Sequence, residues 1–177
     1  AGASVERVAS ECGVGKDTIY RRFPSKVALF DAVVEHVRAQ TLVRLDEETA
    51  SVAASGDALT RLKRLARWFL TINVDPEMVA FKRIAMSEAV VSGGHRSSQS
   101  ADDPIFARLV ARVAAAQQAG TLREDDAGFL ATHLLHCVVY GPSNDAMLGS
   151  IAYATREAQD AFFERAWTLF VEGAAAR

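Results

Sequence analysis

The sequence predicts an all-α protein, and three observations support this prediction. Apolar residues recur at helical spacing over residues 30–45, 59–70, 105–114, 130–141 and 163–174. The strict alternation of apolar and polar residues that marks a half-buried strand is nearly absent. Alanine is abundant throughout, as in helices that pack closely. With 177 residues, half of them hydrophobic, the chain is long enough to bury a sizeable core.

The residues between the apolar stripes carry helix start and stop signals. Asp57 and the pair Asp75–Pro76 are typical of helix N-termini, and Gly120 is typical of a C-terminus. Residues 92–100 form a polar, Gly/Ser-rich loop. The Gly-Pro-Ser sequence at 141–143 predicts a break or kink in the helix that precedes it.

Composition and motifs exclude several classes of protein. No apolar run approaches the ~18 residues that span a membrane. Two cysteines far apart, Cys12 and Cys137, argue against a disulfide framework and for a reducing cytoplasm, and Cys137 is predicted to be a buried thiol. No catalytic motif is present, which predicts that the protein is not an enzyme, and neither a cofactor nor a metal is expected. The pair His133 and His136 lacks a third metal ligand.

The N-terminal stretch predicts a helix-turn-helix. Ser4 can cap a short helix, Gly13 allows a tight turn, and a second short helix follows from about residue 16 to 22, with Val14 expected to plug the core. The net charge is −2, but residues 15–26 carry four basic side chains against one acidic. The alternative is a surface helix with a solvated basic face. The predicted DNA-binding residues are Gly15, Lys16, Asp17, Thr18, Tyr20, Arg21, Arg22 and Lys26.

The residues at 8–9, 13–26 and 29–30 resemble the N-terminal domain of the tetracycline-repressor (TetR) family. Gly15 stands where the family usually has Ser, and Asp17 where it usually has a small residue. Residues 85–126 are similar to the ligand-binding domains of AefR-like members. The resemblance implies a helix-turn-helix domain over residues 1–44, whose first helix would precede Ala3 and is missing from the chain, and a ligand-binding and dimerisation domain over residues 45–177.

The resemblance also implies partners and function. We expect a ligand-responsive repressor that binds a palindromic operator in double-stranded DNA as a homodimer, and that releases it on binding a small, largely apolar effector. The alternative is a helical small-molecule binding protein that does not use DNA. No membrane association is expected, and the expected location is the cytoplasm.

The resemblance places an effector pocket and a dimer interface in the second domain, for which the apolar stripes supply candidates. Each pocket candidate can instead be ordinary core packing, and the interface candidates can be buried in the core of a monomer. The pocket candidates are Trp68, Phe69, Met78, Phe81, Ile84, Phe106, Val110, His133, His136 and Tyr140. The interface candidates, on the predicted last two helices at 126–140 and 156–174, are Leu130, Leu134, Val138, Phe163, Trp167 and Phe170.

Overall fold

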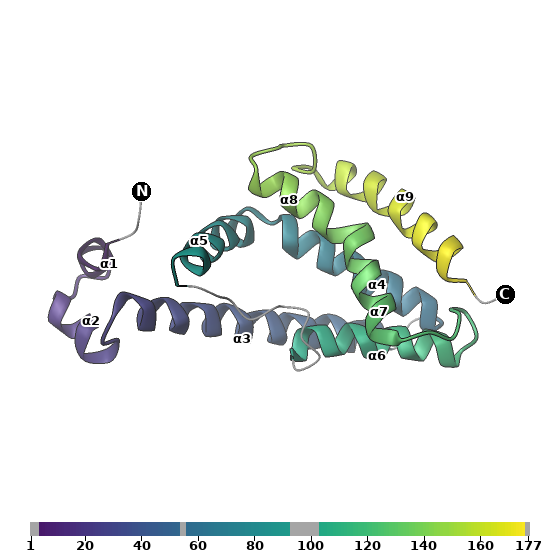
Figure 1. Cartoon of the computed structure of the whole chain (residues 1–177), viewed down its shortest axis with the longest axis horizontal. Helices are drawn as coiled ribbons and strands as arrows, with labels where there is room; N and C mark the ends of the chain where they lie inside the picture. The colour runs from purple at the N-terminus through teal and green to yellow at the C-terminus, as the bar shows by residue number, and fades with distance from the viewer. Residues whose placement is uncertain (1–3, 54–55, 93–102, 176–177) are drawn as a thin grey trace. The chain divides into compact units, whose positions relative to one another are not determined.

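The computed structural model describes residues 4–53, 56–92 and 103–175, and it is helical as predicted (Figure 1). Side chains are described except at 52–53 and 88–92. The helices are α1 (Val5–Glu11), α2 (Lys16–Arg22), α3 (Lys26–Ala53), α4 (Ala58–Val74), α5 (Pro76–Ser92), α6 (Pro104–Gln118), α7 (Ala127–Leu135), the π-helix η1 (His136–Tyr140), α8 (Gly141–Met147) and α9 (Arg156–Ala174).

The predicted start and stop signals act where the sequence placed them. The Asp57 carboxylate accepts a hydrogen bond of 2.7 Å from the Thr60 backbone N–H at the start of α4. Asp75 accepts in the same way from the Met78 N–H at the start of α5. Gly120 follows α6 with a φ of +68°, which glycine adopts without steric cost. The polar loop predicted at 92–100 lies, from residue 93 onward, outside the described residues.

The chain divides into two compact units, Ala1–Val43 and Arg44–Arg177, and α3 runs from the first into the second. The sequence prediction placed this division between residues 44 and 45. Among the described residues, no helix is both long and apolar enough to cross a membrane.

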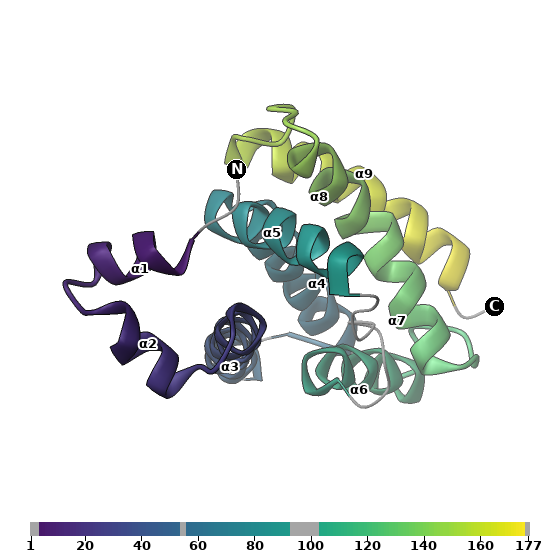
Figure 2. The ribbon, with the colours of Figure 1, turned by 60° about the vertical axis from the view of Figure 1, so that its left-hand side comes forward.

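In the second unit, α4 lies at the centre and packs against α5, α6, α7, η1, α8 and α9 (Figure 2). Its buried face includes Leu62, Ala66 and Phe69, which join one core with residues of the surrounding helices. Ion pairs tie α4 to α9 at the edge of this core. The Arg67 guanidinium pairs with Asp160 and Glu164, and Lys63 pairs with Glu164 at 2.6 Å. These pairs lie beside the apolar contact between α4 and α9.

A break or kink was predicted at 141–143, and the helix does not end there. The chain instead passes from α7 through η1 into α8 without interruption, because the wider π turn accommodates Pro142, which has no N–H and whose ring would clash in a regular helix. The inward residues therefore repeat every four positions, at Leu130, Leu134, Val138 and Pro142. The prediction that Cys137 is buried was wrong, since this spacing turns it out of the core.

Candidate functional site

The first unit builds two short helices around a small core. Val5 and Ala9 of α1 are buried against Ile19 of α2. The Ser4 hydroxyl caps α1 by accepting from the Arg7 N–H at 3.2 Å, and Gly13 makes the turn between the helices with a φ of +66°. The prediction that Val14 plugs the core was wrong. Its backbone is held by a hydrogen bond to the Ala9 carbonyl, and its side chain is 40% exposed.

Burial of Ile19 leaves the rest of α2 facing outward. All the predicted DNA-binding residues are exposed, which is the arrangement that a recognition helix requires. Gly15 occupies the N-cap position of α2 without a capping side chain, so the departure from Ser removes that hydrogen bond. Asp17 lies in the first turn of α2, where a negative charge is favourable toward the helix dipole.

The exposed side chains of α2 differ in how far they are already engaged. Lys16 forms an ion pair with Glu6 of α1, and its ammonium lies 5.6 Å from the centre of the Tyr20 ring. The hydrogen bond between Lys16 and Glu6 lowers the pKa of Glu6 and raises the pKa of Lys16. Arg21 donates to the Thr18 hydroxyl at 3.4 Å. The Arg22 side chain makes no hydrogen bond or ion pair with any described residue, so its guanidinium is available to bind a phosphate.

The predicted effector-pocket residues lie partly in the core and partly at the surface of the second unit. Phe69 and Phe106 are buried in the core, and Trp68, Val110 and Tyr140 pack against it. Of the rest, Met78 and Phe81 are half-buried, and Ile84, His133 and His136 are exposed. These residues therefore stay candidates for an effector site.

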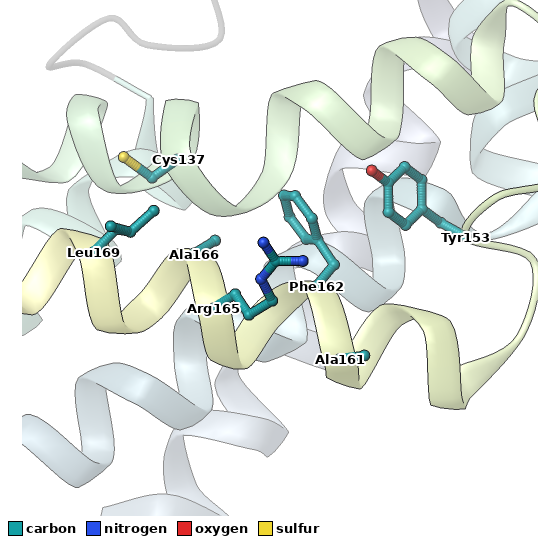
Figure 3. A pocket seen from close by; sticks show the side chains of 7 residues that line it. All are labelled: Cys137, Tyr153, Ala161, Phe162, Arg165, Ala166 and Leu169. Carbon is teal, nitrogen blue, oxygen red and sulfur yellow. The ribbon is translucent and has the colours of Figure 1, made fainter.

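A groove that sequence reasoning missed lies between η1 and α9 (Figure 3). It has a volume of about 530 Å³ and a mostly apolar lining. The side chains that line it are Cys137, Tyr153, Ala161, Phe162, Arg165, Ala166 and Leu169. Burial raises the pKa of the Cys137 thiol, although the residue as a whole is exposed. The sequence signal that could have indicated this groove is the spacing of four between outward positions of α9, namely Ala161, Arg165 and Leu169.

The predicted interface residues require a correction. All six lie in the core of the protomer, at exposures of 0% to 6%, so they have almost no surface left to bury against a second chain. The aromatic stripe of α9 faces inward because it covers α4. There Phe163 lies under the Arg67 guanidinium, 4.3 Å from the ring centre, and stacks against Trp167. The exposed apolar residues of the same helices are others, chiefly Phe129 and Leu169.

Two family profiles match the chain. "Bacterial regulatory proteins, tetR family" matches residues 1–33, and "AefR-like transcriptional repressor, C-terminal domain" matches residues 60–173. Among curated proteins, the nucleoid occlusion factor SlmA of Shewanella frigidimarina is 28% identical over 122 residues, covering 67% of this chain and 57% of that protein. The SlmA of Haemophilus influenzae is 34% identical over 64 residues, covering 36% and 28%. The chain thus matches between about a quarter and just over half of the length of these relatives.

Solved structures have the same fold over nearly the whole chain. A structure from Mesorhizobium loti that is assigned to the TetR family has a TM-score of 0.78 at 21% identity, covering 98% of this chain and 87% of that one. A TetR family transcriptional regulator from Pseudomonas syringae has a TM-score of 0.70 at 24% identity, covering 99% and 87%. Together with the helix-turn-helix geometry, the matches over residues 1–33 and 60–173 show that this chain belongs to the TetR family of transcriptional regulators, with an AefR-like C-terminal domain.

Proposed function

We propose that the protein is a ligand-responsive repressor that acts in the cytoplasm, binds a palindromic operator as a homodimer and releases it when a small, largely apolar effector binds. The observation that carries the DNA-binding part is the exposed face of α2, where hydroxyl and cationic side chains gather and Arg22 is unpaired within the described residues. Lys16, Asp17 and Gly15 lie at the N-terminal end of α2, the end that reads base edges in helix-turn-helix proteins.

We propose further that a second copy covers the groove between η1 and α9. Leu169 of α9 is 71% exposed, and Phe129 of α7, the helix that continues into η1, is 47% exposed. Exposed apolar side chains that lie near one another are typical of an interaction surface. His133 and His136 lie on the same outward side of α7 and η1, where the rings of Phe129, His133 and His136 follow one another. Residues of this kind suit the centre of an interface, and dimerisation would space two recognition helices for a palindrome.

Release of the operator on effector binding would follow from linkage between the two binding sites. An effector that binds better to the arrangement of subunits that does not fit DNA shifts the population toward that arrangement. The coupling is reciprocal, so operator DNA must weaken effector binding by the same factor. The second candidate function, small-molecule binding without DNA, predicts no such reciprocity.

The first test is fluorescence anisotropy of the full-length protein with labelled duplexes from the region upstream of its own gene. We expect one duplex to bind in the presence of competitor DNA, with an affinity that falls steeply with salt. Equal binding of all duplexes, at the ~10⁻⁴–10⁻⁶ M of non-specific association, would favour the small-molecule binding protein.

Replacing Arg22 with Ala is expected to weaken operator binding by about tenfold or more, because each subunit loses a phosphate contact. The slope of log affinity against log salt should become shallower by roughly 2 for the dimer. Anisotropy at several salt concentrations measures both quantities. Arg108→Ala is the matched control, since Arg108 is an exposed arginine of the second unit that pairs with Asp46 at 2.9 Å. An unchanged slope for Arg22→Ala would remove Arg22 from the DNA-binding surface.

A further inference from the structure

The regulator function described so far does not explain the position of Lys82 in the second unit. It lies in α5, its side chain is half-buried, and its ammonium donates to the Ser143 hydroxyl of α8 at 2.9 Å. The same ammonium donates to the Asn73 side-chain oxygen of α4. One cation therefore joins three helices of the unit.

The acceptors of this ammonium are neutral. No carboxylate among the described residues forms an ion pair with Lys82, in contrast to Lys63 and Arg67, which both meet Glu164. Burial alone lowers the pKa of Lys82 to about 8, since no negative group offsets the loss of hydration. Partial burial of a cation without a counter-charge is unfavourable, and an anion bound beside it would offset that cost.

The hydrogen bonds around Lys82 leave donors free for such an anion. The Asn73 amide donates to the Phe69 carbonyl at 2.7 Å, which fixes its oxygen toward the ammonium. An ammonium has three donors, and two of them are engaged with described residues. Ser143, which is 2% exposed, accepts from Lys82 and keeps its own hydroxyl proton to donate. An N–H and an O–H donor side by side match the two oxygens of a carboxylate.

Apolar residues precede both Lys82 and Ser143 by one helical turn. Met78 and Val79, one turn before Lys82 on α5, are half-buried and buried. On the neighbouring helix, Val139 and Tyr140 lie one turn before Ser143 and are buried and half-buried. The anionic group would therefore meet the two donors while the remainder of the molecule meets aliphatic and aromatic side chains.

We propose that Lys82, Asn73 and Ser143, where α4, α5 and α8 meet, form the head-group subsite for an effector that carries a carboxylate on an apolar chain. This inference rests on the proposed function, whose effector it assigns to a chemical class. Lys82 and Ser143 bind the carboxylate oxygens, and Asn73 orients the ammonium.

The test uses straight-chain carboxylates from butanoate to decanoate, each compared with the amide of the same length, by calorimetry on the full chain without DNA. At pH 7 we expect at least one carboxylate to bind about tenfold more tightly than its amide, because its charge pairs with the ammonium. The preference should fall as the pH rises through 8, where Lys82 loses its proton while the carboxylate stays ionised.

Lys82→Met should reduce the preference for the carboxylate to within about twofold, and Lys82→Gln, which keeps a polar group near Ser143, should do the same. Arg83→Met is the matched control. Arg83 is the next cation along α5, but it donates to the carbonyls of Met147 and Ala146 at 2.7 and 2.9 Å, so its loss should leave the preference intact. Circular dichroism of each variant reports whether it folds.

Two results would overturn the subsite. One is that no carboxylate binds the wild-type chain better than its amide, and the other is that the preference survives in folded Lys82→Met and Lys82→Gln. The operator assay is independent of both. Specific operator binding without a preference for the carboxylate would reject the subsite but not the proposed regulator function. Absence of specific operator binding would reject the regulator function, whatever the calorimetry shows.

Discussion

We expect Phe163→Ala to lower the free energy of unfolding by about 3–5 kcal/mol, the range for a phenylalanine removed from a packed core. Phe163 has 0% of its surface exposed. Its ring stacks against that of Trp167 with a centroid distance of 6.1 Å, and the Arg67 guanidinium covers it at 4.3 Å. The substitution therefore removes apolar contacts and leaves a cavity between α4 and α9.

Urea denaturation followed by circular dichroism measures this effect, at a fixed protein concentration so that any dimer contributes equally. Leu148→Ala is the control, because Leu148 is 88% exposed and should change the free energy by less than about 0.5 kcal/mol. A Phe163→Ala protein within about 1 kcal/mol of the wild type would contradict the buried position.

The second large effect is expected from Leu169→Glu, which should convert the proposed dimer into a folded monomer. Leu169 lines the groove and is exposed in the protomer, so the protomer tolerates a carboxylate there. A dimer that covers the groove would bury that charge without a partner, and we expect its dissociation constant to rise by roughly a hundredfold or more. Operator affinity should fall with it, because one monomer contacts only a half-site.

Sedimentation equilibrium measures the association, and anisotropy measures the operator affinity. Leu148→Glu introduces the same charge at an exposed leucine outside the groove lining, and it should leave both quantities unchanged. If Leu169→Glu remains dimeric at micromolar concentration, the copies associate through another face. Comparison with Phe163→Ala separates the two roles of α9, since one variant loses stability and the other loses association.

The helix-turn-helix was predictable from the sequence because each of its determinants is local. Ser4 caps the helix that it precedes, and Gly13 makes the turn in which it lies. Ile19 is buried against α1, the helix directly before its own in the sequence. The all-α class and the family followed from the same kind of local signal, and both are confirmed.

The second unit was less predictable because its inward faces depend on how the helices pack. Periodicity identified the stripe of Phe163, Trp167 and Phe170, but it could not say whether a helix of the same chain or a second copy covers it. The pairs of Arg67 with Asp160 and Glu164, far away in sequence, align this stripe with α4. Tyr153 joins the groove from a segment without any periodic pattern, so no local rule could place it.

The π turn at His136–Tyr140 shifts the phase of the helix that contains it. One extra residue in the turn lets the segments before and after it bury their apolar rows on the same side, at Leu134 and then at Val138 and Pro142. Which side chains of η1 face the groove thus depends on the number of residues in that turn and not only on their identity. A single-residue deletion there would rotate α8 relative to α7, moving Ser143 away from Lys82 while every side chain involved was kept.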